Sequence, residues 1–100
     1  MKKETGKTII SADERRELKK QAHHLKPVVI IGRKGLTEAV IAEIESALLA
    51  HELIKVQIHP THKVTLLADM ASVVEKTLSS YIDTVGNIVI LYRKRDPVEE

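Results

Sequence analysis

The chain contains no cysteine, no tryptophan and no phenylalanine, and its only aromatic residues are two tyrosines. The absence of cysteine excludes disulfide bonds, cysteine-based zinc sites and thiol catalysis. Two tyrosines are too few for the broad aromatic platform on which many single-strand binders stack nucleobases. If the partner is a nucleic acid, its recognition should therefore rest on phosphates and shape, with strong salt dependence and weak sequence specificity.

Long apolar runs are absent as well. No run approaches the roughly eighteen residues of a membrane-spanning helix, and no long apolar region follows residues 1–7 as it would in a secretory signal. We therefore expect a cytoplasmic protein with no membrane partner. The length of 100 residues predicts one domain over 11–93, with a flexible basic tail over 1–10 and a charged tail over 94–100. A monomer is expected.

The charge is unevenly distributed, although the net value is only +2. Residues 1–35 hold ten Lys/Arg against four Asp/Glu, and residues 36–52 hold four acidic residues and no basic ones. The remainder is balanced, with six of each sign. A basic first third predicts one basic face, the electrostatic footprint of a nucleic-acid partner. The alternative is a solvated helix with a lysine-rich tail.

Hydrophobic periodicity predicts three helices and four strands. Ser11, with Glu14 three residues later, forms a capping box that starts a helix over 12–24 with a thin apolar stripe and a basic side. Thr37 caps a second helix that ends near His51, and a third helix is expected over 63–79. The strands are expected over 28–31, 53–59, 81–85 and 88–93, and the last two flank the hairpin dipeptide Gly86-Asn87.

These elements predict a compact α/β domain in the order α-β-α-β-α-β-β, with a mixed four-stranded sheet packed against helices. The first strand is a continuous β-branched run, which is typical of a strand buried on both faces. The following helix and strand complete a βαβ unit.

The most informative segment is Gly32-Arg33-Lys34-Gly35, between the first strand and the second helix. Glycine permits positive φ and close backbone approach, and a helix beginning at once would offer free N–H groups. Neither the Walker pattern nor the dinucleotide fingerprint is present. The two cations between the glycines favour a clamp for a nucleic-acid backbone, most of all RNA, as in the G-x-x-G loop of KH domains. The alternative is a tight strand-to-helix turn.

Ten residues are predicted to bind RNA. They are Gly32, Arg33, Lys34, Gly35, Arg15, Arg16, Lys19, Lys20, Lys26 and Arg93. The run Arg93-Lys94-Arg95 either extends the basic surface or only solubilises the tail. His59 and His62 lie three apart but have no third ligand in an ordered spacing, so we interpret the histidines as surface or half-buried residues. No metal, no cofactor and no enzymatic activity are expected, because no catalytic constellation is present.

Several blocks of the chain resemble the YhbY family of stand-alone CRM (chloroplast RNA splicing and ribosome maturation) domains. The blocks are Leu25-Lys26-Pro27-Val28-Val29-Ile30-Ile31-Gly32, Gly35-Leu36-Thr37, His51-Glu52-Leu53-Ile54-Lys55-Val56 and Gly86-Asn87-Ile88-Val89-Ile90-Leu91-Tyr92-Arg93. The resemblance implies a fold similar to the C-terminal domain of translation initiation factor three. It also implies RNA binding through the loop 32–35, and association with precursors of the large ribosomal subunit. The alternative from another class is a protein-interaction module whose basic face binds an acidic partner.

Overall fold

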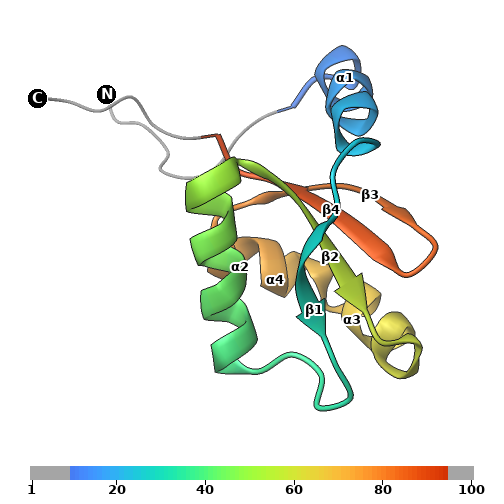
Figure 1. The fold of residues 1–100 in the computed structure, drawn as a ribbon, viewed down its shortest axis with the longest axis vertical. Helices are drawn as coiled ribbons and strands as arrows, with labels where there is room; N and C mark the ends of the chain where they lie inside the picture. The colour runs from blue at the N-terminus through green and yellow to red at the C-terminus, as the bar shows by residue number, and fades with distance from the viewer. Residues whose placement is uncertain (1–9, 95–100) are drawn as a thin grey trace, which may run out of the picture.

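The computed structural model describes residues 10–94, so the predicted tails lie almost entirely outside the described residues. Along these described residues, four α-helices, one 3-10 helix and four strands follow one another (Figure 1). Their bounds are α1 Ala12–Ala22, β1 Pro27–Ile31, α2 Glu38–His51, β2 Leu53–Ile58, η1 Pro60–His62, α3 Lys63–Ala68, α4 Met70–Thr77, β3 Ser80–Val85 and β4 Ile88–Tyr92. The predicted mixed α/β fold is confirmed, and its third helix is divided into α3 and α4.

The four strands form one mixed sheet in the order β1-β2-β4-β3. β1 and β2 are parallel because α2 carries the chain back between them, and β3 and β4 are antiparallel because only two residues, Gly86 and Asn87, connect them. β4 also pairs with β2 in antiparallel fashion, and this joins the two halves of the sheet. Gly86 supplies the positive φ (+62°) that the hairpin turn needs.

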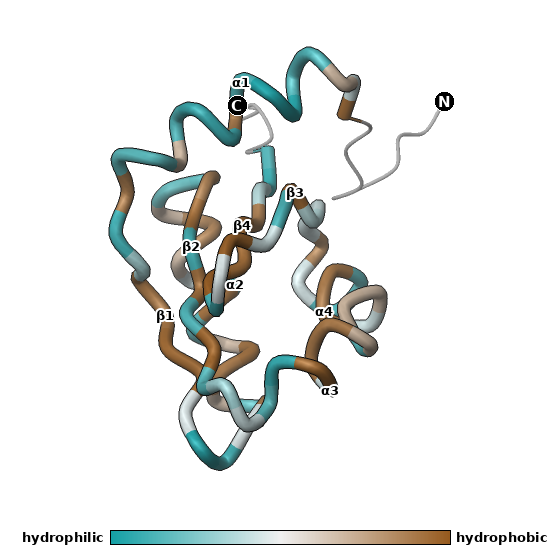
Figure 2. The backbone as a smooth tube through the Cα atoms, turned by 90° about the vertical axis from the view of Figure 1, so that its right-hand side faces the viewer, coloured by the Kyte–Doolittle hydropathy of each residue, from teal (hydrophilic) through white to brown (hydrophobic). Residues whose placement is uncertain are grey.

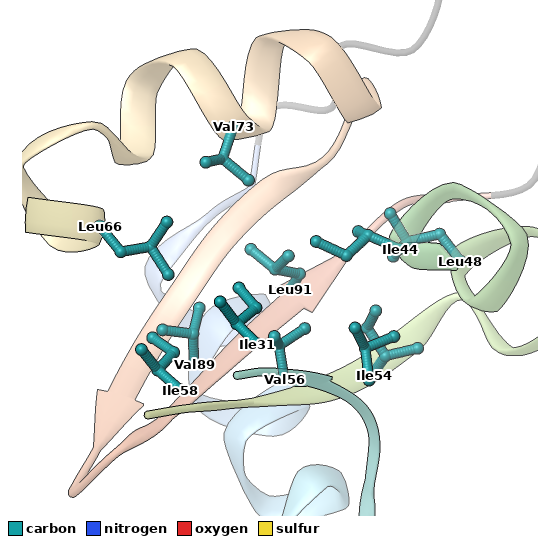
Figure 3. Packing of buried hydrophobic residues seen from close by; sticks show 11 residues of the cluster. Ile31, Ile44, Leu48, Ile54, Val56, Ile58, Leu66, Val73, Val89 and Leu91 are labelled. Atoms are coloured by element: carbon teal, nitrogen blue, oxygen red, sulfur yellow. The ribbon is translucent and has the colours of Figure 1, made fainter. Parts of the chain in front are cut away.

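The main core lies between one face of the sheet and the helices α2, α3 and α4 (Figure 3). Alternate residues of β1, β2 and β4 point into it, as the period of two in a strand requires. The buried members are Val29, Ile31, Ile54, Val56, Ile58, Val89 and Leu91 from the sheet, and Ile44, Leu48, Leu66 and Val73 from the helices. Ile31, the last residue of β1, is among them, so the core fixes the point at which the loop 32–35 begins.

Helix α1 packs on the opposite face of the sheet. Its start is fixed as predicted, because Ser11 Oγ accepts a hydrogen bond of 3.1 Å from the Glu14 N–H. Its two buried residues, Leu18 and Ala22, belong to a second and smaller cluster. The sheet residues of this cluster are Leu53, Ile82 and Ile90. The two sides of the sheet are therefore covered unequally.

The prediction that the first strand is buried on both faces is wrong. β1 lies at the edge of the sheet, and its residues alternate, so that Val29 and Ile31 are buried while Val28 and Ile30 are 50% and 64% exposed. The continuous β-branched run has one face in the main core and one face that α1 does not cover. An apolar run alone does not reveal whether a strand is central or at an edge.

The single helix predicted over 63–79 is also wrong, because the chain leaves helical geometry at Asp69 (φ −98°, ψ 15°). The Asp69 N–H donates to the carbonyls of Thr65 and Leu66, which ends α3, and the Asp69 carbonyl accepts from the next helix. Each short helix can then turn a different residue toward the sheet. Val64 and Leu78, which a single apolar stripe would bury, are 81% and 41% exposed.

Candidate nucleic-acid interface

Residues 32–35 form a hydrogen-bonded turn, here named the GRKG turn. The Gly35 N–H donates to the Gly32 carbonyl over 3.0 Å, so Arg33 and Lys34 are the two central residues. Both are exposed, and within residues 10–94 neither side chain takes part in an ion pair. The turn lies where β1 ends, at the lower end of the view in Figure 1. It presents two adjacent positive charges to solvent.

The two glycines of the GRKG turn have different roles. Gly35 has a φ of +79°, and a Cβ placed there would lie 3.2 Å from Cε1 and 3.3 Å from Nδ1 of the His62 ring. Gly32 has a φ outside the left-handed region, and a Cβ there would meet no atom within 4 Å. The expected need for positive φ therefore holds for Gly35 and not for Gly32. Glycine at position 32 leaves open space beside an exposed backbone.

His62 holds the turn from a segment far away in the sequence. It is the last residue of η1, and its imidazole Nε2 donates to the Arg33 carbonyl while the ring packs against Gly35. The segment is itself fixed to the end of β1, since the His59 N–H donates to the Ile31 carbonyl over 2.8 Å. This arrangement places Lys63, the first residue of α3, next to the residue that contacts the turn.

The expectation that a helix begins at once after the turn is corrected. Leu36 and Thr37 lie between the turn and α2, which begins at Glu38. Thr37 caps the helix as predicted, because its Oγ1 accepts from the Val40 N–H over 3.2 Å. The carboxylate of Glu38 stands in the first turn of the helix and offsets part of its positive dipole. The cations and backbone of the GRKG turn, rather than the helix end, form its attractive surface.

Three of the four predicted cations on α1 already have partners within the protein. The Arg15 guanidinium donates to the carbonyls of Tyr81 and Ile82 on β3, over 2.7 and 3.0 Å. Arg16 pairs with Asp13 at 3.1 Å, and both side chains are largely exposed.

Lys19 pairs with Asp83 at 2.8 Å. Its hydrogen bond holds the pKa of the Asp83 carboxyl below the ordinary value of 3.8. Lys20 is exposed and takes part in no ion pair within residues 10–94. On α1, then, Arg15 and Lys19 attach the helix to β3, and Lys20 is left to face solvent.

The structure does not bring the ten predicted residues into one cluster. Lys26 precedes β1, and the Arg93 N–H donates to the Glu52 carbonyl just before β2, so both lie at the end of the sheet opposite the GRKG turn. Helix α1 lies toward that same end in both Figure 1 and Figure 2. The predicted residues therefore form two basic regions, the GRKG turn at one end of the sheet, and α1 with Lys26 and Arg93 toward the other.

The two tyrosines are used in packing. Tyr81 packs against the main core, and its hydroxyl shares a hydrogen bond with Thr84 Oγ1. Tyr92 packs against the α1 cluster, and this burial raises the pKa of its hydroxyl. Neither is a fully exposed ring on which a base would stack, in agreement with the low aromatic content.

A family model of the CRS1 / YhbY (CRM) domain matches residues 10–93 of the chain. The chain belongs to this family. The match covers both basic regions and the whole sheet, and it confirms the resemblance drawn from the sequence blocks. Within residues 10–94 of this CRM domain, no helix combines the length and apolar character that a bilayer crossing requires.

Relatives and a solved structure agree with the family assignment. The chain is 44% identical over 93 residues to a protein of Haemophilus influenzae named RNA-binding protein, which covers 93% of this chain and 91% of the relative. It is 35% identical to a probable RNA-binding protein of Pseudomonas aeruginosa, covering 85% and 82% of the two chains. The solution structure of a hypothetical protein from Staphylococcus aureus has a TM-score of 0.70 at 24% identity, covering 91% and 95%. That likeness shows a shared fold.

Sequence reasoning missed the contact between His62 and the GRKG turn of this CRM domain. The sequence pattern led us to consider His62 as a metal ligand and to prefer a surface or half-buried histidine. Within residues 10–94, no group of three His, Cys, Asp or Glu side chains could hold a metal ion. The only local signal was that His62 and Lys63 follow β2, the strand that runs parallel to β1. Parallel neighbours end at the same edge of a sheet, and this would have placed the segment beside the turn.

Proposed function

We propose that this chain binds RNA, and that the GRKG turn grips the phosphate backbone. The observation that carries the proposal is an exposed, hydrogen-bonded turn with two adjacent cations that have no ion pair within residues 10–94. Its conformation is held in advance by Gly35 and His62, so little ordering is needed when a ligand binds. The family membership and the names of the relatives support RNA as the ligand.

We propose that Lys63 adds to the same phosphate-binding surface, because it follows the residue that contacts the turn. Lys20 and Lys26 form a second contact for a longer RNA. β1 lies between the two regions, and its five residues at about 3.3 Å each separate them by roughly 15 Å. Arg15, Arg16 and Lys19 contribute less, since each already has a partner.

The proposal is tested by the salt dependence of binding. Lys34→Ala should lower the slope of log affinity against log salt concentration by about one, and Arg33→Ala should do the same. Lys76→Ala is the matched control, since it removes one exposed cation from α4, an element that makes no part of the turn. A slope that changes equally in Lys34→Ala and Lys76→Ala would mean that the protein attracts RNA only through its overall charge.

Gly32→Ala adds a second test. The fold leaves room for the extra methyl group, so a loss of affinity without a loss of stability would indicate that the RNA backbone approaches Gly32 closely. Retention of full affinity would place the RNA at the side chains of Arg33 and Lys34 alone.

The physiological RNA that we propose is the precursor of the large ribosomal subunit, bound in the cytoplasm by a monomer that performs no chemistry of its own. This part rests on family membership, since electrostatics alone would allow weak binding to any RNA. In a sucrose gradient at moderate salt, the protein should sediment with precursor particles and not with translating ribosomes. A deletion strain should accumulate immature large subunits, more so in the cold. Protein at the top of the gradient together with normal subunit profiles would refute this role.

A further inference from the structure

A row of side chains crosses the uncovered part of the sheet face on which α1 packs. The registers of the three strand pairs align Ile30 of β1 with Gln57 of β2, Gln57 with Ile88 of β4, and Ile88 with Val85 of β3. Registered partners point to the same side of a sheet, so these four side chains form one row, named here the open row. At about 4.8 Å between strands it extends over roughly 14 Å.

The open row is apolar at both ends and accessible. Ile30 is 64% exposed and Val85 is 59% exposed, while the polar side chain of Gln57 is exposed between them. In the neighbouring row, Ile90 is buried under α1 and Asp83 forms an ion pair with Lys19 of α1. Helix α1 therefore covers that row and leaves the open row uncovered. Exposed Ile30 and Val85 lie in one row with the half-buried Ile88, and this differs from apolar residues scattered singly over a surface.

Two lysines lie beside the open row, and Asp83 neutralises one of them. A groove of about 230 Å³ runs between α1 and the sheet, and its walls are Lys19, His23, Lys55, Val85, Ile88 and Ile90. The carboxylate of Asp83 pairs with Lys19, and Lys55 Nζ donates to the Leu25 carbonyl, which keeps the Lys55 ammonium beside the groove. At the other side of the row, Ile30 is two residues from Gly32 and the GRKG turn.

We propose that the open row is a contact surface for unpaired nucleobases of the RNA whose phosphates the GRKG turn holds. The inference rests on the proposed function and adds base contacts to it. An unpaired base has a flat apolar face, a polar edge and a neighbouring phosphate. Ile30 and Val85 match the face, and the Gln57 amide both donates to and accepts from the edge. The Lys55 ammonium beside the groove matches the charge. A purely apolar protein partner would leave the Lys55 ammonium, which takes part in no ion pair within residues 10–94, without a counter-charge.

The test compares a single-stranded RNA of about twelve nucleotides with an abasic strand of the same length. Both strands carry the same phosphates, so their affinity ratio isolates the bases. For the unaltered protein the ratio should be about fivefold to tenfold, the scale expected for covering two half-exposed aliphatic side chains. In the double variant Ile30→Ser/Val85→Ser the ratio should fall toward one, and the affinity for the abasic strand should stay the same.

Leu49→Ser is the control, because Leu49 is 59% exposed on α2, which packs on the other face of the sheet. Gln57→Ala provides a second variant in case the double variant is unstable in a urea titration, and it should also lower the ratio. A ratio of one for the unaltered protein, or a ratio that the variants do not change, would overturn the inference.

Two further outcomes separate the possible failures. If the salt slope depends on Arg33 and Lys34 while the ratio is one, the open row is wrong and the proposed function stands. If Arg33→Ala and Lys34→Ala change the binding of neither the intact nor the abasic RNA, the proposed function itself is wrong. Self-association that the double variant abolishes would instead identify the row as an interface between two copies of the chain, and would also overturn the inference.

Discussion

Replacing Gly35 by alanine tests how the GRKG turn is held. The native φ of +79° costs an L-residue roughly 1–2 kcal/mol. The new methyl group would also lie 3.2 Å from the His62 ring, so the ring must shift by a few tenths of an ångström against its hydrogen bond to the Arg33 carbonyl. Together these effects should lower the free energy of unfolding by about 2 kcal/mol, which leaves a domain of ordinary stability folded.

The comparison is with Gly32→Ala, which meets no atom within 4 Å and needs no left-handed backbone. Its free energy of unfolding should change by less than about 0.5 kcal/mol, or rise slightly because alanine restricts the unfolded chain. Urea titrations followed by circular dichroism measure both changes, and a loss of about 2 kcal/mol corresponds to a melting point lower by roughly 10 °C. Equal stability of the two variants would refute the distinction between the glycines.

Three further results are expected. His62→Ala should weaken RNA binding and lower the free energy of unfolding by about 1 kcal/mol. His62→Gln, which keeps a hydrogen-bond donor, should restore part of the affinity. If His62→Ala bound RNA as tightly as the unaltered protein in a filter-binding assay, His62 would not be a positioning residue. Arg15→Met keeps the aliphatic stem but leaves two carbonyls of β3 without their donor, so urea titration should show a loss of about 2 kcal/mol. Because the lowered pKa of Asp83 means that its ionised form stabilises the folded state, this contribution is present above the unfolded pKa and is lost as pH falls through the folded value. Asp83→Asn removes the half-exposed ion pair with Lys19, so its free energy of unfolding at neutral pH should be lower than that of the unaltered protein by under about 1 kcal/mol. The difference should vanish in strong acid, and a difference that persists there would contradict a stabilising role of the ionised Asp83 carboxylate.

Local signals in the sequence predicted much of the fold. The caps at Ser11 and Thr37 and the hairpin at Gly86-Asn87 depend on side chains and backbone within a few residues, and all three were located correctly. The break at Asp69 was not predicted, because aspartate within an apolar helical pattern carries no strong stop signal. Tertiary packing favours the break, because it lets α3 bury Leu66 and α4 bury Val73 against the sheet.

The candidate site was predictable only where its residues are consecutive. The GRKG turn follows from four adjacent residues, whereas its contact with His62 depends on the parallel pairing of β1 with β2. The partners of Arg15 and Lys19 lie on β3, more than sixty residues later in the chain. Charge counting along a sequence cannot distinguish a cation that faces solvent from one that binds a carbonyl or a carboxylate across the fold.

The unequal coverage of the sheet has a consequence for hydrogen exchange. Among residues 10–94, eleven buried residues form the main core and five form the α1 cluster, and two of these five belong to the helix itself. Helix α1 can therefore detach by a local opening that leaves the sheet intact, so its amide protons should exchange faster than those of β2, which lies between two strands. An RNA that bridges α1 and the sheet would suppress this opening. Slower exchange would then extend along the whole helix, including amides that the RNA does not touch.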